Sequence, residues 1–402
     1  MANPATSSSQ RYIEALIEEL DISEARYEQA EDSYKSLGRW LNRPESTIAA
    51  YDPAVYVQGS FGLGTVIKPL NLGEEYDVDA VCELKSLGKS QVSQQRLKQM
   101  LGAEIEAYRR SKNMVKPLRE GRRCWTLNYA DGAQFHMDVV PALPNGREVR
   151  TLLETKGFDA RWAGTAIAIT DNERADYHMI TSDWPRSNPK GYLEWFKSRM
   201  IVQLNERKQR LAKSISASVE NIPDYRVRTP LQSSIMVLKR HRDMMFERDE
   251  INCCPISIII TTLAAHAYRG EEDVTDALYS ILSGMDSYIE RNGRLAIVRN
   301  PSDPMENFAD KWEEYPERET SFYNWLRQAR ADFARIASMT NSSQITEALS
   351  PHVGVELAKR AETRVRGGSS PTLRAATASA ATAGAPAFGS VPRVPSKPKG
   401  FA

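Results

Sequence analysis

The sequence predicts an α+β fold in which an α/β half is followed by a largely helical half. Three observations lead to this prediction. A helical pattern of apolar residues opens the chain, stretches typical of β-strands follow it up to about residue 140, and helical patterns replace them from Tyr192 onward. The length of 402 residues and a hydrophobic content of 41% suffice for one large core or two medium ones, so two or three lobes are expected.

The first predicted element is a helix at residues 10–42, where apolar side chains recur at roughly every third or fourth position until Pro44 stops the pattern. A short apolar strand is expected at 55–57, and a glycine-rich turn at 59–65 follows it. The next strand, at 76–82, alternates apolar and acidic residues, so one of its faces is predicted to point into a core.

The remainder of the α/β half consists of one helix and two strands. Residues 90–112 predict a polar amphipathic helix. Two strands, at 123–129 and 134–140, are separated by the turn signal Asp131-Gly132, which predicts a hairpin. A connector rich in Trp and Pro at 184–191 closes this half.

The second half is predicted to be helical and to end in a flexible tail. Helices are expected at 192–212, 229–247, 255–269, 272–291, 304–314, 319–338 and 344–362. After Arg366 the composition changes to Gly, Ser, Ala, Pro and Thr with few large apolar residues, so this segment cannot bury enough surface to become ordered. The expected organisation is an N-terminal helix at 1–45, an α/β core at 46–190, a helical lobe at 191–365 and a flexible tail at 366–402.

The distribution of charge limits the classes of partner. Lys and Arg total 53 and Asp and Glu total 52, but the stretch from Arg366 to Ala402 holds five basic residues and no acidic one. The rest of the chain is therefore slightly acidic. That is a poor match for a constitutive nucleic-acid binder, which usually carries a basic face, although a local basic groove remains compatible with it.

Cysteine content and hydropathy favour a cytoplasmic protein with no membrane segment. The four cysteines make no CxxC pair and have no histidines at zinc-ligand spacing, which is typical of reduced thiols. The N-terminus has neither a basic nor an apolar signal region. The most apolar run, at 256–267, is too short to span a bilayer and fits a buried helix.

Three aspartates are the candidate catalytic residues. Asp77 and Asp79 are separated by one residue on a predicted strand, so both carboxylates project from the same face while Val78 points into the core. Such a pair repels itself unless it is solvated or a cation lies between the oxygens, and Mg²⁺ prefers carboxylates together with phosphates. Asp138 lies in another apolar strand, where an unpaired charge is costly.

If the strands of these aspartates are neighbours, three carboxylates converge. They would hold two Mg²⁺ ions, with Mn²⁺ as a substitute, for an in-line phosphoryl transfer in which Asp138 is the expected general base. The alternative is that Asp-x-Asp is only a solvated strand face.

A turn before these acids offers a place for phosphate groups. In Gln58-Gly59-Ser60, glycine allows the backbone to approach a phosphate closely, and the N–H groups and the Ser60 hydroxyl can bind its oxygens. A helix is expected to begin at Gly64-Thr65. The spacing matches neither a Walker A loop nor a dinucleotide-binding fingerprint. A tight turn without a ligand is the alternative, but the ordered set of strand, Gly-Ser, helix, Asp-x-Asp and a lone strand Asp favours a nucleotidyltransferase core.

At these residues the chain resembles the polymerase β-type nucleotidyltransferases, and within them the bacterial cGAS/DncV-like nucleotidyltransferases (CD-NTases) of anti-phage (CBASS) systems. The resemblance covers about residues 10–365. It is most specific in three stretches, namely Gln58-Gly59-Ser60-Phe61 with Gly64-Thr65, Glu75-Tyr76-Asp77-Val78-Asp79, and Met137-Asp138-Val139-Val140-Pro141.

Three further stretches resemble the family more loosely. Lys239, in Leu238-Lys239-Arg240-His241-Arg242-Asp243, matches a lysine that contacts the phosphates of the donor nucleotide. Ser257, in Pro255-Ile256-Ser257, matches a serine that contacts the nucleotide. The last stretch, which resembles a signature lining the base pocket, comprises Asn300-Pro301, Glu306-Asn307-Phe308 and Trp312.

Purely structural explanations remain open for several of these residues. The basic run that contains Lys239 can be a solvated helix face, and Ser257 can simply open a helix after Pro255. His241 is a weak candidate for a general base. Trp184 and Trp195 are expected to pack rather than to stack on a base.

The resemblance implies a bilobed fold with a mixed sheet, a long N-terminal spine helix and a facing helical lobe, with the active site in the cleft between them. It implies nucleoside triphosphate (NTP) substrates, ATP among them, and a cyclic di- or trinucleotide product that acts on a downstream effector in anti-phage defence. It also implies a regulator encoded in the same operon, either a HORMA-type activator or an E1/E2-like ligase that acts on the C-terminal tail. No zinc ribbon of the kind used for DNA sensing is found.

Two other functions stay open on the sequence alone. One is transfer of a nucleotide to a protein, a small molecule or an RNA end. The other is a non-catalytic nucleotide-binding scaffold, against which the presence of all three aspartates argues. Base specificity, ring size and linkage cannot be derived from the sequence.

Overall fold

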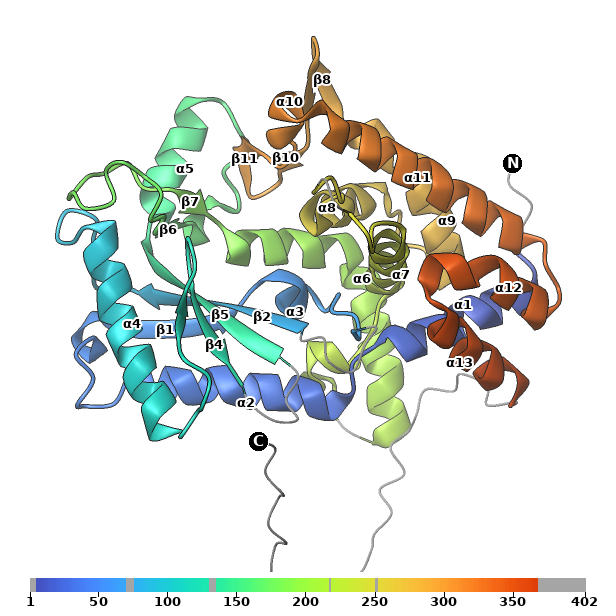
Figure 1. Cartoon of the computed structure of the whole chain (residues 1–402), viewed down its shortest axis with the longest axis horizontal. Coiled ribbons are helices and arrows are strands. Elements are labelled where there is room, and N and C mark those ends of the chain that lie inside the picture. Colours follow the sequence, from blue (N-terminus) through green and yellow to red (C-terminus); the bar gives the residue numbers. More distant parts are fainter. Residues whose placement is uncertain (1–4, 70–75, 130–134, 217, 250–251, 368–402) are drawn as a thin grey trace, which may run out of the picture.

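The computed structural model describes residues 5–69, 76–129, 135–216, 218–249 and 252–367. It shows an α+β molecule in which a sheet-containing lobe faces a helical lobe (Figure 1), as the sequence predicted. The Asp131-Gly132 turn and the stretch from residue 368 to the end, which holds nearly all of the predicted tail, lie outside the described residues. Within the described ranges, no helix is both long enough and apolar enough to cross a membrane.

The sheet lobe is built on one mixed sheet whose strand order is β1-β2-β5-β4-β3, with β6 beside β5 and β7 beside β6. Only β2 and β5 are parallel, and the other pairs are antiparallel. The strands are β1 (Pro53–Val57), β2 (Tyr76–Leu84), β3 (Arg119–Glu120), β4 (Trp125–Asn128), β5 (Phe135–Pro144), β6 (Ile167–Ile169) and β7 (Arg186–Ser187). The predicted strands at 55–57, 76–82, 123–129 and 134–140 correspond to β1, β2, β4 and β5, and the antiparallel pairing of the last two is confirmed.

Helices α2 (Glu24–Leu41) and α4 (Gln94–Ser111) pack on one face of this sheet (Figure 1). Alternate residues of β2, including Val78 and Ala80, are fully buried among their side chains. The sequence prediction that Val78 points into the core is therefore confirmed. The opposite face of β2 carries the acidic residues. The smaller elements of this lobe are α3 (Gly59–Leu63), α5 (Gly146–Thr155) and the 3₁₀ turns η1 (Ala49–Tyr51) and η2 (Ala163–Thr165).

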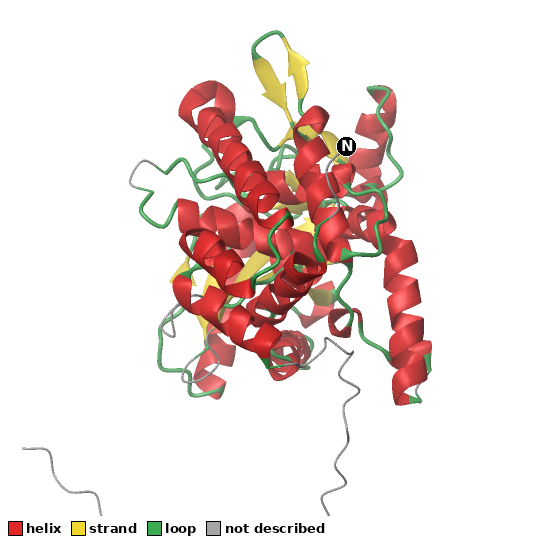
Figure 2. Ribbon diagram, turned by 90° about the vertical axis from the view of Figure 1, so that its right-hand side faces the viewer, coloured by secondary structure: helices red, strands yellow, loops and turns green. Residues whose placement is uncertain are grey.

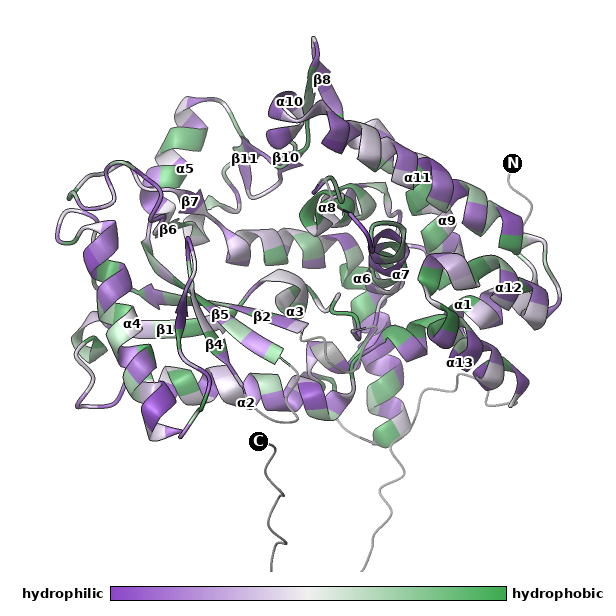
Figure 3. Ribbon diagram, in the orientation of Figure 1, coloured by the Kyte–Doolittle hydropathy of each residue, from purple (hydrophilic) through white to green (hydrophobic). Residues whose placement is uncertain are grey.

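The helical lobe encloses its own hydrophobic core. Viewed from the helical side, the helices lie in front of most of the strands (Figure 2). Helix α8 is hydrophobic along most of its length (Figure 3), and nearly all of its residues are buried at the centre of this lobe. The helices are α6 (Pro189–Ile215), α7 (Pro230–Met245), α8 (Ser257–Ala267), α9 (Val274–Gly284), α10 (Lys311–Glu314), α11 (Pro316–Ala337), α12 (Ser342–Val353) and α13 (Val355–Arg366), with the short elements η3 (Val219–Asn221), η4 (Asp224–Arg226), η5 (Met285–Tyr288), β8 (Glu290–Asn292), β9 (Leu295–Ile297), β10 (Arg299–Asn300) and β11 (Asp303–Asn307).

The predicted N-terminal helix is interrupted. It consists of α1 (Ser7–Leu20) and α2, separated by a short extended segment that runs from Asp21 to Ser23. The apolar residues of α1 belong to the core of the helical lobe, whereas those of α2 belong to the core of the sheet lobe. The break lies where the chain passes from one core to the other, so the spine is two helices that each serve a different lobe.

Two other helix predictions need correction. The helix predicted at 304–314 is wrong in its first half, because β10 and β11 form a small hairpin there and only α10 is helical. The helix predicted at 344–362 is two helices, since Gly354 adopts φ 98° between α12 and α13.

Candidate active site

The three predicted aspartates come together on adjacent strands. The parallel register of β2 and β5 places Asp79 directly opposite Asp138. Asp77 lies two residues before Asp79 and therefore projects from the same face of the sheet. On the other side of β5, the hydroxyl of Thr126 in β4 donates a 2.6 Å hydrogen bond to Oδ1 of Asp138. Three carboxylates are thus carried by one patch of sheet.

Their electrostatics differ from one residue to the next. Burial, together with the neighbouring charges of Asp77 and Asp138, raises the pKa of Asp79 to about 6. The pKa of Asp77 is lowered, mainly by a 2.9 Å hydrogen bond from Nε2 of His136. The donor atoms of the three aspartates do not all lie within 4.8 Å of one another.

This donor set fits a hard dication. All of its ligand atoms are carboxylate oxygens. The pKa of Asp79 is raised first by burial and then by the charges of Asp77 and Asp138, and a cation would neutralise that charge. The residues present are therefore compatible with Mg²⁺.

A glycine turn packs directly against Asp79. Gln58 donates its backbone N–H to the carbonyl of Asp79 at 2.8 Å and precedes the first residue of α3. Gly59 has φ 59°, and a Cβ atom on it would lie 2.1 Å from Oδ2 of Asp79. Glycine is therefore required here both for the backbone conformation and for space.

The helix of this turn begins earlier than the sequence predicted. It runs from Gly59 to Leu63, and Gly64, with φ 66°, ends it. The prediction of a helix start at Gly64-Thr65 is wrong. Because a first helical turn has N–H groups without partners inside the helix, the observed start places those groups beside Asp79 rather than several residues away.

The opposite wall of the site comes from the helical lobe. Lys239 of α7 is buried, and its Nζ donates to the carbonyl of Thr65 at 3.0 Å. Burial, followed by repulsion from Arg242, lowers the pKa of Lys239 to about 8. The ammonium carries three donors, so two are left after the bond to Thr65.

Ser257, the first residue of α8, lies beside Lys239 along the same wall. Its Oγ accepts a 2.7 Å hydrogen bond from Nη1 of Arg242, which also donates to the carbonyl of Pro255. The hydroxyl proton of Ser257 remains to be donated.

These two walls enclose a cleft of about 610 Å³. Its lining includes six residues singled out by the sequence, namely Gly59, Ser60, Asp77, Asp79, Lys239 and Ser257. The volume falls within the range of small-molecule sites, roughly 300–1,000 Å³. A cleft that joins carboxylates on one wall to a buried lysine on the other is suited to a bound polyphosphate.

Comparison with known proteins shows which family the sequence of this region matches. Residues 8–167 match the family model described as the Second Messenger Oligonucleotide or Dinucleotide Synthetase domain. The chain is a nucleotidyltransferase that carries this synthetase domain. The aspartates, the glycine turn and most of the sheet lie within the matched region, whereas Lys239 and Ser257 lie beyond it.

Two similar proteins align with most of this nucleotidyltransferase. A c-di-GMP synthase of Roseivirga ehrenbergii is 27% identical over 317 residues, which is 77% of this chain and 75% of that protein. The cyclic dinucleotide synthase CdnG of Bradyrhizobium diazoefficiens is 24% identical over 336 residues, 78% of this chain and 73% of that protein.

Solved structures share the fold. CdnG in complex with GTP superposes with a TM-score of 0.67 at 19% identity, covering 89% of this chain and 99% of that one. CdnC from E. coli MS115-1, solved in a HORMA complex, superposes with a TM-score of 0.55 at 13% identity and covers 87% and 97% of the two chains.

A smaller pocket of about 210 Å³ adjoins the cleft of the nucleotidyltransferase. It is lined by Gln58 and Gly59 from the turn, and by three residues of the predicted late signature, Asn300, Glu306 and Phe308. The other three signature residues, Pro301, Asn307 and Trp312, are not among its lining residues. The side chain of Asn307 bonds the backbone of its own loop, and Trp312 is buried against Phe322.

Sequence reasoning missed two residues of this pocket. Asn188 precedes α6 and accepts the N–H of Gly191 through its side chain, and Tyr192 follows one turn later. Both lie in or next to a stretch taken for a connector. The signal that could have found them is Asn188 followed by Pro189, which is a helix-start pattern.

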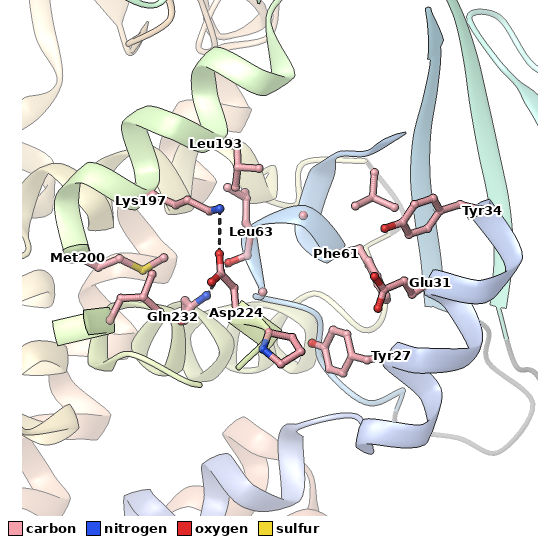
Figure 4. Close-up of a pocket in the computed structure, with 15 residues that line it drawn as sticks. Tyr27, Glu31, Tyr34, Phe61, Leu63, Leu193, Lys197, Met200, Asp224 and Gln232 are labelled. Atoms are coloured by element: carbon pink, nitrogen blue, oxygen red, sulfur yellow. Dashed lines mark hydrogen bonds and ion pairs between the residues drawn. The ribbon is translucent and has the colours of Figure 1, made fainter. Parts of the chain in front are cut away.

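A third pocket, of about 320 Å³, lies behind α3 and is drawn in Figure 4. Tyr27, Glu31 and Tyr34 of α2 form one side, and the ion pair of Lys197 with Asp224 at 2.9 Å forms another. It contains none of the three aspartates and is not the site of nucleotidyl transfer.

The remaining candidates do not reach the cleft. His241 is fully buried inside the helical lobe, paired with Asp332 at 3.0 Å, so it is not a general base for the cleft. Trp184 and Trp195 are buried packing residues, as predicted. The four cysteines are free thiols.

Proposed function

We propose that this nucleotidyltransferase joins nucleoside triphosphates, ATP or GTP, into a cyclic di- or trinucleotide second messenger. The observation that supports the proposal best is the register of β2 and β5, which sets Asp79 opposite Asp138 with Asp77 on the same face and the Gly59-Ser60 turn against them. The two relatives described above are named as cyclic dinucleotide synthases, which agrees with it.

In this proposal each wall of the cleft has a separate task. Asp77 and Asp79 would hold two divalent ions, and Asp138 would contribute to one of them and accept the proton of the attacking hydroxyl. Mg²⁺, or Mn²⁺ in its place, would supply Lewis acidity that activates the hydroxyl and neutralises charge on the phosphates. The ribose 2′- or 3′-hydroxyl forms a bond to the α-phosphorus of a second nucleotide, and the bond from that phosphorus to pyrophosphate breaks.

The phosphates are held by the turn and by the helical lobe. The backbone N–H groups of Gly59 and Ser60 and the Ser60 hydroxyl bind the phosphates on the sheet side, while Gln58 borders the base pocket. Lys239 and Ser257 bind them from the other wall, each through a donor that its contacts within the protein leave unused. Closing the cleft between two lobes in this way aligns the attacking and leaving groups.

The smaller pocket is suited to a guanine base. Nδ2 of Asn300 donates to Oε2 of Glu306 at 2.7 Å, which leaves Oε1 as an acceptor. Guanine presents two N–H donors on its Watson–Crick edge, where adenine presents one donor and one acceptor. A carboxylate, which only accepts when ionised, therefore favours guanine. GTP is accordingly proposed as one substrate.

The biological setting is proposed from the family resemblance. We expect a cytoplasmic enzyme of anti-phage defence whose product acts on a downstream effector. A regulator would be either a HORMA-type protein, as in the complex of CdnC, or an E1/E2-like ligase that acts on residues 366–402.

The test is mass spectrometry of the product made by purified protein with all four NTPs and Mg²⁺ and no added acceptor. A phosphatase-resistant cyclic product that is absent for the double variant Asp77→Asn, Asp79→Asn supports the proposal. A product that forms only when a protein, small molecule or RNA is added would assign the enzyme to nucleotide transfer instead. If the double variant retained full activity, or if the parent turned over no NTP with or without an acceptor, the proposed catalytic site would be refuted.

A further inference from the structure

A second polar cluster lies deep in the helical lobe, away from the cleft. It consists of His241 on α7, Asp332 on α11 and His352 on α12. His241 is fully buried, Asp332 is 6% exposed and the side chain of His352 is 25% exposed. Nothing in the proposed nucleotidyl transfer uses these residues, yet three separate helices bring them together.

One oxygen of Asp332 lies close to both histidines. Its Oδ2 lies 3.0 Å from Nε2 of His241 and 3.2 Å from Nδ1 of His352. All three donor atoms lie within 4.8 Å of one another, and the two imidazole rings are stacked with an angle of 8° between their planes. Ligands of a tetrahedral ion with bonds of about 2.0 Å are roughly 3.3 Å apart, so the two distances to Oδ2 already match two edges of such a site.

Gln328, one turn before Asp332 on α11, supports this carboxylate. Its Nε2 donates to both oxygens of Asp332 at 3.0 Å. An outer hydrogen bond of this kind orients a carboxylate that binds a metal ion.

We propose that His241, Asp332 and His352 form a structural site for a transition-metal dication of the zinc class. Two histidines and one carboxylate are typical ligands of such ions and are distinct from the all-oxygen set of the cleft. The ion would join α7, α11 and α12. Since α7 also carries Lys239 and Arg242, the site would fix the helix that forms one wall of the cleft.

The probes are Zn²⁺ and Co²⁺, added to full-length metal-free protein in the Asp77→Asn, Asp79→Asn background, which removes the Asp-x-Asp pair of the cleft. We expect one equivalent of Zn²⁺ to be retained after gel filtration. Co²⁺ should give the intense visible absorption of a tetrahedral site with nitrogen ligands, and a hundredfold excess of Zn²⁺ over its Kd should raise the unfolding midpoint by roughly 3 °C.

Two substitutions at the half-buried ligand serve as matched variants. His352→Gln should lose both the retained metal and the visible band, whereas His352→Cys, which keeps a zinc ligand, should retain metal. No retained Zn²⁺ and no Co²⁺ band in the parent background would overturn the proposal and leave a hydrogen-bonded His-Asp-His cluster. Equal metal content in the parent background and in His352→Gln would also overturn it.

Discussion

Gly59 is the residue at which backbone conformation and catalysis meet most closely. Its φ is 59°, and a Cβ atom would lie 2.1 Å from Oδ2 of Asp79. Gly59→Ala is expected to lower kcat/KM at least about 100-fold, because Asp79 must move away from the other two aspartates. Gly157→Ala is the matched control, since Gly157 has φ 73° but nothing within 4 Å of its added Cβ.

Both substitutions should cost about 1 kcal/mol of stability through the left-handed backbone conformation. Only Gly59→Ala should lose activity. Steady-state kinetics with thermal unfolding of both variants make the comparison, and equal activities would show that the contact with Asp79 is unimportant.

Asp79 makes stability depend on pH in the metal-free protein. Burial and its two acidic neighbours raise its pKa to about 6, above its ordinary value of 3.8. The folded protein binds the proton of Asp79 more tightly than the unfolded protein does. The stabilisation from this proton is therefore complete below the unfolded pKa and is lost as the pH rises from about 4 through 6.

Asp79→Asn removes this effect. In EDTA the variant should be more stable than the parent by about 3 kcal/mol at pH 8 and nearly equal to it at pH 4, as measured by urea unfolding. Mg²⁺ should narrow the difference at pH 8, because a cation stabilises the ionised carboxylate. A difference that does not vary with pH would show that Asp79 is not destabilised by its charge.

Glu306 is the residue expected to select guanine. Glu306→Gln replaces one acceptor oxygen by a donor, so kcat/KM for GTP should fall about 10- to 100-fold while ATP is affected less. Glu313→Gln, on the exposed surface of α10, is the control. Competition assays with labelled GTP and ATP measure the ratio, and an unchanged ratio would remove Glu306 from base selection.

At the scale of elements, the junction of α1 and α2 is secured by an ion pair. Arg228, next to the start of α7, binds the carboxylate of Asp21 through two hydrogen bonds of 3.0 and 2.8 Å. Both side chains are largely buried, with 13% and 28% exposed. Arg228→Ala leaves Asp21 without this partner and should lower the free energy of unfolding by about 3 kcal/mol.

Arg360→Ala provides the comparison. Arg360 is 52% exposed where it pairs with Glu19, and exposed pairs contribute less than about 1 kcal/mol. Urea unfolding of both variants tests the difference. Equal losses would mean that the buried pair at the junction has no special role.

The elements that carry the active site could be predicted from the sequence because their patterns are local. Apolar and acidic residues alternate along β2, which predicted that Val78 faces the core and that Asp77 and Asp79 lie on the other face. The structure agrees. The hairpin of β10 and β11 could not be predicted, because side-chain hydrogen bonds shape it. The backbone N–H of Ser302 donates to the side chain of Asn300, and that of Val298 donates to the side chain of Asn307. Such bonds produce no periodic pattern in the sequence from which the hairpin could be predicted.

Contacts between distant segments were also beyond the sequence. The break at Asp21 depends on Arg228, about 200 residues later, and the cluster around Asp332 depends on three helices. The chemistry of the cleft was predicted as residue types, while its division between two lobes required the fold. The roles of Lys239 and Ser257 in binding phosphate stay predictions.

For the whole molecule, the tail is expected to be separable from catalysis. The described fold ends with α13 at Arg366, and both hydrophobic cores lie before that point. Removing residues 368–402 should therefore leave the unfolding midpoint and the rate of synthesis unchanged. In the presence of an E1/E2-like ligase it should abolish conjugation, which gel-shift analysis detects. Conjugation of the shortened chain would refute a role for the tail.

The packing of α1 against α13 determines when the protein is complete during translation. The hydroxyl of Tyr12 donates to the carbonyl of Ala358 at 2.9 Å, so α1 is bound to α13, which follows every other helix of the described residues. The core of the helical lobe includes the apolar residues of α1, and its other helices follow the sheet lobe in the sequence. A ribosome therefore releases α1 long before its partners exist, and this helix must wait with its apolar face exposed until the final helix emerges. A chain synthesised only as far as α8 thus contains the lining residues of both walls of the cleft, but it lacks the helices that complete the core of the helical lobe.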